Sequence, residues 1–305
     1  MYNLSFVETA EKQYHHYKIQ NNKGTEMILF HEYGAAMMQL KLEGKNLVDN
    51  IQTTQDGRLS FLNSSCSAVL FPFANRIKDG HYSFDKKEYQ LDCNEVKLGH
   101  ALHGLVNKAA FEMDDFKSDQ NTAKISFVRT ENNPPPGFPF PFTIKLIYTL
   151  TNTGLRLSVT IQNIGKEAFP FSLGWHPYFY SSKLDDSSLE IKSRQKITND
   201  KRMIPTGVVD SMFPNPLNLK DQTFDNTFLL EDTKVVYKTP NYQMQLDSFG
   251  DQQQQYIHFY IPSHRQSIAI EPMTAAADCF NNHIGVKLLA SGASYTLDWQ
   301  VELLA

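Results

Sequence analysis

Cysteine is scarce in this sequence, with three residues in a chain of 305: Cys66, Cys93 and Cys279. The number is odd and no two of them are spaced as Cys-x-x-Cys, so the sequence predicts neither a disulfide framework nor a zinc knuckle. We therefore expect reduced thiols that serve mostly structural roles.

Long apolar runs and clusters of a single charge are also missing. No stretch approaches the roughly 18 apolar residues that a membrane-spanning helix needs, and the N-terminal MYNLSFVETA has no basic segment followed by an apolar one. The net charge is only -4 and Lys and Arg are scattered along the chain, which argues against a nucleic acid or a membrane surface as partner. With 41% hydrophobic and 20% charged residues, the chain has the composition of a globular protein. We expect a soluble, cytoplasmic protein.

The common nucleotide and hydrolase motifs are absent too. The sequence has no Gly-x-Gly-x-x-Gly after a strand, no P-loop motif, no Gly-x-Ser-x-Gly and no His-Glu-x-x-His, which removes the main support for the corresponding chemistries. His100 and His103 lie three residues apart, but they have no third ligand nearby, and Gly99 and Gly104 favour a loop. We predict no metal site and no cofactor.

The pattern that is present has a period of two. From 155 to 161 apolar residues alternate with polar ones, which places one apolar row on one face of a strand. Similar runs occur at 144–150, 256–261, 267–271 and 295–303. Turn signals separate the runs, and no long segment shows a helical apolar stripe.

These runs predict an all-β fold, a large antiparallel β-sandwich, which we expect to form one domain over residues 1–305. The prolines of Pro134–Pro136 are followed at once by further strand patterns, so we interpret them as a long surface loop rather than a domain linker. The glutamine run at 252–255 is predicted to be another loop.

Four segments combine polar side chains with apolar flanks, as expected where strand ends open into a cleft. FPFANRIKDG contains Asn75 and Arg76, and the planar guanidinium suits hydroxyl or carboxylate recognition. LGHALHG contains His103. Taken alone, a surface arginine in a salt bridge and a hydrogen-bonded loop histidine explain these residues at least as well.

The other two segments contain candidates for proton transfer. FPFSLGWHPYFY places His176 among aromatic side chains such as Trp175 and Tyr178; aromatic faces stack on the apolar face of a pyranose, and an imidazole titrates close to neutral pH. In SIAIEPM, Glu271 ends an alternating run beside Ile270, which favours a raised pKa and a role as general base. A satisfied core histidine and a surface glutamate at a turn are the structural alternatives for each residue alone.

Taken together and in this order, the four segments resemble the aldose 1-epimerase (galactose mutarotase) family, from about Phe71 to the C-terminus. FPFANRI is similar to the Asn-Arg-Ile segment of the family, HALHG to its Leu-His-Gly motif, GWHPYF to its second histidine motif and IAIEPM to its catalytic glutamate segment. The resemblance implies a galactose mutarotase-like supersandwich that interconverts the anomers of an aldose. It implies that His176 is the general acid and Glu271 the general base. The substrate-binding residues that it implies are Arg76, His103 and Asn75. Asp225 is added to them through the shorter match TFDNTF.

Two departures concern the substrate. Leu105 replaces a glycine that often follows His-Gly in the family, and Trp-His-Pro-Tyr-Phe resembles the hexose-6-phosphate epimerase-like branch. Because no additional cluster of Arg or Lys flanks the motifs, we predict that the substrate is a free hexose such as galactose or glucose, handled by a monomer or a homodimer. A hexose-6-phosphate 1-epimerase and a non-catalytic carbohydrate-binding or regulatory protein are the alternatives.

Overall fold

The hairpin of β13 (Phe142–Leu150) and β14 (Gly154–Asn163) shows how the period-two pattern becomes a sheet. Every second residue of β13 is buried, and the register sets Ile144 opposite Ile161 and Leu146 opposite Val159. Apolar side chains therefore meet on one face of the pair. This is a computed structural model that describes residues 1–9, 14–49, 65–250 and 255–305.

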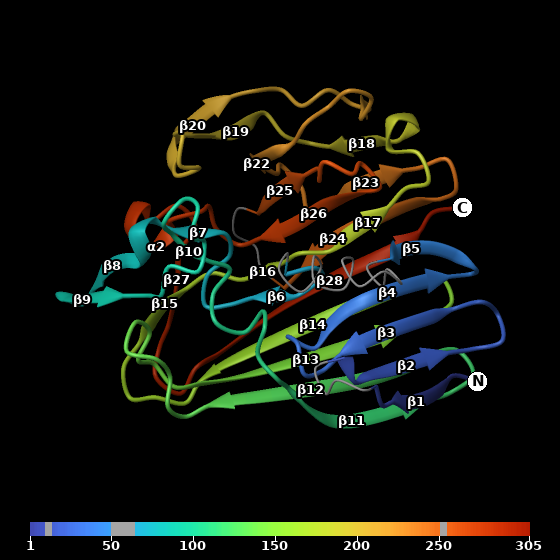
Figure 1. Ribbon diagram of the computed structural model, residues 1–305, viewed down its shortest axis with the longest axis horizontal. Coiled ribbons are helices and arrows are strands. Elements are labelled where there is room, and N and C mark those ends of the chain that lie inside the picture. The colour runs from blue at the N-terminus through green and yellow to red at the C-terminus, as the bar shows by residue number, and fades with distance from the viewer. Residues whose placement is uncertain (10–13, 50–64, 251–254) are drawn as a thin grey trace.

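A nine-stranded sheet contains this hairpin as its third and fourth strands (Figure 1). All of its neighbouring strands pair antiparallel. In spatial order the sheet consists of β11 (Glu112–Ser118), β12 (Ala123–Glu131), β13, β14, β28 (Ser294–Leu303), β24 (Gln243–Phe249), β23 (Val235–Lys238), β18 (Ser188–Ile191) and β21 (Leu217–Asn218).

A second, eight-stranded sheet carries the segments that contain His176, Glu271 and Asp225. Seven of its strands follow one path and β17 (Tyr178–Tyr180) pairs with β26 beside that path. The path runs through β20 (Pro205–Asp210), β19 (Gln195–Asn199), β22 (Asp225–Leu229), β25 (Tyr256–Tyr260), β26 (Ser267–Met273), β16 (Gly174–Trp175) and β6 (Val69–Leu70).

Smaller sheets flank these two. A five-stranded meander forms the N-terminal part, coloured blue in Figure 1. It consists of β1 (Asn3–Val7), β2 (His16–Gln20), β3 (Glu26–Phe30), β4 (Ala36–Leu42) and β5 (Lys45–Asp49). Three pairs of short strands complete the description: β7 (Arg76–Ile77) with β10 (Ala101–Leu102), β8 (His81–Phe84) with β9 (Lys87–Gln90), and β15 (Phe169–Phe171) with β27 (Lys287–Leu289).

The main core lies between the two large sheets. Trp175 of β16 and Trp299 of β28 are both fully buried, and their rings stack at 6.0 Å with an interplanar angle of 20°. One tryptophan comes from each sheet, so the contact joins the two layers of the sandwich. The predicted antiparallel all-β sandwich is confirmed.

Helix is rare in the described part of the chain. The longest segments are α2 (Cys279–Asn282) and the 3-10 turns η2 (Lys78–Gly80) and η3 (Leu184–Asp186), and no helix there is long and apolar enough to cross a membrane. The proline segment is a loop between adjacent strands β12 and β13 of one sheet, as predicted. Residues 252–254 of the glutamine run lie outside the described residues.

All three cysteines are free thiols, as predicted. Cys66 and Cys279 are buried, whereas Cys93 is exposed. A structural role in packing therefore fits the first two only.

Candidate active site

Glu271 lies on β26, a strand whose seven residues are all buried. The strand is paired on both sides, with β25 on one side and with β16 and β17 on the other. The register sets His258 of β25 directly opposite Glu271, and the glutamate is only 1% exposed. A carboxyl group this deeply buried requires polar neighbours.

His176 supplies one of these neighbours from the turn between β16 and β17. Its backbone is fixed by two hydrogen bonds: Ser67 N–H donates to its carbonyl at 2.7 Å, and its own N–H donates to Ala68 O at 3.1 Å. The imidazole stacks on Tyr178 with ring centroids 5.0 Å apart and an interplanar angle of 7°. Its Nε2 atom lies 3.4 Å from Oε1 of Glu271.

Arg76 and His103 come from the short β7–β10 ladder. The guanidinium donates to both carboxylate oxygens of Glu95 at 2.8 Å and to Oδ1 of Asn75 at 3.2 Å. His103 N–H donates to Asn75 O at 2.9 Å, and both residues have left-handed backbone conformations, with φ of 65° and 59°. Such conformations in non-glycine residues are uncommon and cluster at functional sites.

Gly104 explains why a glycine must follow His103. Its φ is +72°, and a Cβ atom at this position would lie 2.2 Å from Phe71 O. The close approach allows Leu105 N–H to donate to the same carbonyl at 2.7 Å. The strand end that carries Asn75 and the loop that carries His103 are thereby held together.

Asp225 and His258 form a third polar group, on β22 and β25. Nε2 of His258 lies 3.2 Å from Oδ1 of Asp225, and its Nδ1 lies 2.8 Å from the hydroxyl of Thr227. The histidine ring is therefore bonded at both nitrogens, which fixes its orientation beside Glu271.

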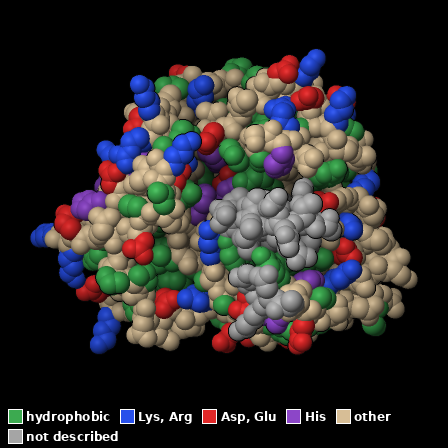
Figure 2. Space-filling view, viewed as in Figure 1, with side chains coloured by type: hydrophobic (Ala, Val, Ile, Leu, Met, Phe, Trp, Pro, Cys, Tyr) green, Lys and Arg blue, Asp and Glu red, His purple; other side chains and the backbone are tan. Residues whose placement is uncertain are grey.

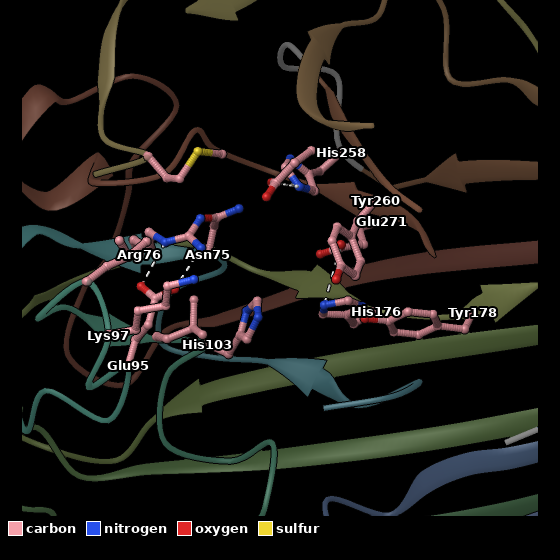
Figure 3. A pocket seen from close by; sticks show the side chains of 14 residues that line it. Asn75, Arg76, Glu95, Lys97, His103, His176, Tyr178, His258, Tyr260 and Glu271 are labelled. Atoms are coloured by element: carbon pink, nitrogen blue, oxygen red, sulfur yellow. Dashed lines mark hydrogen bonds and ion pairs between the residues drawn. The ribbon is translucent and has the colours of Figure 1, made fainter. Parts of the chain in front are cut away.

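These groups line one pocket of about 440 Å³ (Figure 3). On this face of the molecule histidine and acidic side chains gather at a hollow (Figure 2). All six residues selected from the sequence are among its lining, which consists of Asn75, Arg76, Glu95, Lys97, Leu98, Leu102, His103, His176, Tyr178, Met203, Asp225, His258, Tyr260 and Glu271.

The comparison with known families agrees with this site. A family model described as aldose 1-epimerase matches residues 15–302. The chain belongs to the aldose 1-epimerase family. The resemblance seen in the four motifs is thereby confirmed, and the family assignment covers nearly the whole chain.

Individual relatives in the family are distant. The uncharacterized protein YihR of Escherichia coli (strain K12) is 27% identical over 278 residues, which cover 88% of this chain and 87% of that protein. Galactose mutarotase of Homo sapiens is 30% identical over 147 residues, 47% of this chain and 41% of that protein. The crystal structure of a galactose mutarotase-like protein from Clostridium acetobutylicum has a TM-score of 0.85 at 20% identity, over 99% of this chain and 98% of that chain, and so shares the fold.

Burial dominates the electrostatics of Glu271 and His176. It raises the pKa of Glu271 to about 7, while the positive fields of His258 and Arg76 partly oppose the shift. It lowers the pKa of His176 to about 3, and for the same reason the pKa of His103 lies well below its usual value. The raised pKa expected for Glu271 is confirmed.

The other ring nitrogen of His176 lacks a partner. Its Nδ1 atom is buried and has no hydrogen-bond partner among the described residues. Burial disfavours the charged form of each group, so a proton held by the pair favours Glu271 and leaves the imidazole neutral.

Asp225 behaves in the opposite way to Glu271. Burial acts to raise its pKa, but the hydrogen bond and charge of His258, together with the charge of Arg76, outweigh burial and lower it. Asp225 is therefore an ionised acceptor at neutral pH, well suited to bind sugar hydroxyl groups.

The sequence argument did not find His258, Tyr260 or Glu95. The first two were noted only as part of a strand pattern, and their position opposite β26 depends on strand register. Among the aromatic residues around His176, Tyr178 lines the pocket, whereas Trp175 packs in the core against Trp299. The predicted aromatic surround is therefore correct only in part.

His100 is a structural residue. Its Nδ1 accepts a hydrogen bond from Asp79 N–H at 3.0 Å, and its Nε2 lies 3.1 Å from Arg202 O. Within the described ranges no group of three or more His, Cys, Asp and Glu side chains could hold a metal ion.

Proposed function

We propose that this protein is an aldose 1-epimerase that interconverts the α and β anomers of a free hexose. The observation that supports this proposal best is the 3.4 Å contact between His176 and Glu271 in the pocket of a chain that belongs to the aldose 1-epimerase family. Mutarotation needs one base for the C1 hydroxyl proton and one acid for the ring oxygen, and two adjacent groups that share one proton supply both.

The reaction uses this proton without consuming it. Glu271 takes the proton of the C1 hydroxyl while His176 gives its proton to the ring oxygen, the C1–O5 bond breaks and a free aldehyde forms. After rotation about C1–C2, Glu271 returns its proton to the carbonyl oxygen, His176 recovers the other from the C5 hydroxyl, and the ring closes on the opposite face.

The electrostatics of the pocket favour the open-chain stage of the reaction, in which the sugar is a free aldehyde. When the ring is open, Glu271 is protonated and His176 is neutral, and burial stabilises this same distribution. Before ring opening, the proton must be on His176, and Glu271 is close enough to pass it across. Arg76 and His103 orient the sugar and stabilise charge that develops at the ring oxygen.

The charges around the pocket support an unphosphorylated substrate. Its lining contains two cationic side chains, Arg76 and Lys97, and three acidic ones, Glu95, Asp225 and Glu271. The fork of Arg76 is occupied by Glu95, so Lys97, an exposed residue, is the cation left to bind a phosphate. With Glu271 protonated, two ionised carboxylates balance the two cations, so a phosphate dianion would meet no excess of positive charge.

Anomer exchange of glucose, galactose and glucose 6-phosphate, followed by polarimetry, tests the proposal. We expect turnover of at least one free hexose well above the buffer rate and a lower kcat/KM for glucose 6-phosphate. A preference for glucose 6-phosphate would replace the free-hexose proposal by a hexose-6-phosphate 1-epimerase. Calorimetric binding of hexoses with no acceleration of anomer exchange would show a carbohydrate-binding protein instead.

A further inference from the structure

Two segments that are distant in the sequence meet at the rim of the pocket. The 95–100 loop contributes three residues to the lining, among them Glu95 and Leu98, and the turn between β19 and β20 contributes Met203. Arg202 precedes Met203 in that turn but lies outside the lining. It can therefore influence a bound sugar only through other residues.

The side chain of Arg202 ties the turn to the loop. Its Nε and Nη2 atoms donate to the backbone carbonyl of Leu98 at 3.2 and 2.9 Å, and Nη2 also pairs with Asp79. Gly99 has a φ of +72°, and a Cβ atom there would lie 3.4 Å from Nη2. The guanidinium thus lies directly against the loop backbone. Because its acceptor is a main-chain atom, it constrains the path of the loop itself.

His100 makes a second connection between the same two segments. Its ring is fully buried, Nδ1 accepts a hydrogen bond from Asp79 N–H at 3.0 Å, and Nε2 lies 3.1 Å from Arg202 O. Since Nδ1 accepts, the ring proton is on Nε2 and is donated to that carbonyl. Asp200 Oδ1 accepts from Arg202 N–H at 2.8 Å. The main chain of Arg202 is therefore fixed, and its side chain is directed toward the loop.

The 95–100 loop is a tight turn that carries Glu95. Glu95 N–H donates to His100 O at 3.0 Å, and Gly99 N–H donates to Glu95 O at 2.8 Å, so a displacement of the loop would be passed on to Glu95. The carboxylate of Glu95 accepts two hydrogen bonds from Arg76 at 2.8 Å (Figure 3). A short series of contacts thus leads from Arg202 to the guanidinium in the pocket wall.

We propose that Arg202 is a positioning residue of the active site. It holds the 95–100 loop against the β19–β20 turn, the loop fixes Glu95, and Glu95 fixes Arg76. This inference rests on the proposed epimerase function, because the role of Arg76 is exerted in the reaction. The restraint on the loop can nevertheless be measured without turnover.

Three substitutions separate the forked hydrogen bonds from charge and from general stability. Arg202→Met keeps an apolar stem but removes every donor. Arg202→Lys keeps the charge beside Asp79 but lacks the planar fork that donates twice to one carbonyl. Arg194→Met is the matched control, because Arg194 precedes β19 at its other end and pairs with Glu231 outside the pocket lining.

Hydrogen exchange of the loop amides reports on the restraint directly. The N–H groups of Glu95 and Gly99 are bonded within the loop, and in Arg202→Met they should exchange about tenfold faster, the effect of about two lost hydrogen bonds. Arg194→Met should leave their exchange rates unchanged. Equal rates in wild type and Arg202→Met would overturn the proposal, whatever the activity.

Polarimetric kcat and KM for glucose and galactose report on the consequence for the site. We expect Arg202→Met to lower kcat about three- to tenfold and to raise KM, because Arg76 loses its fixed orientation. Arg202→Lys should recover only part of this loss, and Arg194→Met should stay within about twofold of wild type. Faster loop exchange with unchanged kcat and KM would show a purely structural contact and overturn the positioning role.

A double variant tests the route through Glu95. In the Glu95→Gln background, Arg202→Met should have little further effect on kcat, since both changes act on Arg76 through the same contact. Fully additive losses would show that Arg202 acts on the pocket by another route and would overturn the proposal.

Failure of the epimerase proposal gives a different result. If wild type turns over neither hexose, that function is refuted, and calorimetric binding of galactose decides on Arg202. Weaker binding by Arg202→Met but not by Arg194→Met would keep the positioning role at a sugar-binding site. Unchanged or absent binding would overturn it as well.

Discussion

His176 and Glu271 are in direct contact in the pocket, and Nδ1 of the histidine has no hydrogen-bond partner among the described residues. Nε2 of the histidine lies 3.4 Å from Oε1 of the glutamate, and their side chains are 6% and 2% exposed. Because both charged forms are disfavoured by burial, the pair as a whole holds one proton over a wide pH range. In the proposed reaction, activity depends on that shared proton.

Removal of either member should therefore stop most of the reaction. We expect Glu271→Gln and His176→Asn each to lower kcat at least about tenfold, since a positioned acid or base contributes about 10²- to 10⁴-fold. The double variant should be little slower than the slower single variant, because the groups act as a unit. Polarimetry against the uncatalysed drift measures the rates, and Glu190→Gln, an exposed residue of β18, is the control. Full activity of either single variant would contradict the assignment.

The pH dependence follows from the same proton. The pair holds one proton between about pH 3, where His176 titrates, and about pH 7, where Glu271 loses its proton. Above pH 7 a base remains but the pair has no acid, so kcat/KM should fall as pH rises from 7 to 9 with a slope approaching one. Initial rates in overlapping buffers measure this limb. An increase in kcat/KM through pH 7 would mean that the ionised carboxylate alone limits the reaction.

Glu271 should also make the fold less stable as pH rises. Its pKa in the folded protein, about 7, lies above the ordinary value of 4.5, so between these values the folded chain retains a proton that the unfolded chain has lost. Stability then decreases with increasing pH, by about 3 kcal/mol in total. Glu271→Gln removes this loss, so its free energy of unfolding relative to wild type should rise between pH 4.5 and 8.

His176 contributes in the opposite sense, since its pKa is lowered. Its stabilising contribution is complete above about pH 6.5 and is lost as pH falls toward 3. Urea unfolding measures the free energy of unfolding of Glu271→Gln and of wild type. Both proteins keep the contribution of His176, so the difference between the two free energies reports on the glutamate. A difference that stays constant with pH would show that the carboxyl group titrates normally.

Local patterns allowed much of the fold and the site to be predicted. Alternation marked the long strands such as β13 and β14 because one face of each is buried and the other is not. Five of the six selected residues lie at strand ends or in tight turns, where polar side chains point into a cleft, whereas Glu271 lies inside β26; all six meet in one pocket. Family resemblance contributed their order and their roles.

The remaining features depend on contacts between distant segments. His258 looks like any other member of the buried run YIHFYI, and only the register with β26 brings it beside Glu271. Glu95 is 19 residues from Arg76, and no local pattern pairs them. The lowered pKa of His176 could not be predicted either, because it results from burial in the folded protein and from the charge of His258.

Glu95 should act as a positioning residue for Arg76. Its two hydrogen bonds hold the guanidinium at the wall of the pocket, where the two side chains are 16% and 12% exposed. Glu95→Gln keeps the shape but removes the charge and one of the two parallel acceptors, so the guanidinium should lose its fixed orientation. Because the role proposed for Arg76 is to stabilise charge that develops at the ring oxygen, kcat should fall about three- to tenfold together with a rise in KM.

A matched pair elsewhere separates this effect from a general loss of stability. Arg129 and Glu131 on β12 form a partly buried ion pair away from the pocket lining, so Glu131→Gln should leave both constants within about twofold. Glu95→Asp retains the charge and should restore part of kcat. If Glu95→Gln changes KM alone, Arg76 contributes uniform binding and not stabilisation of the transition state. If Glu131→Gln lowers kcat as much as Glu95→Gln does, the loss reflects the fold and not the orientation of Arg76.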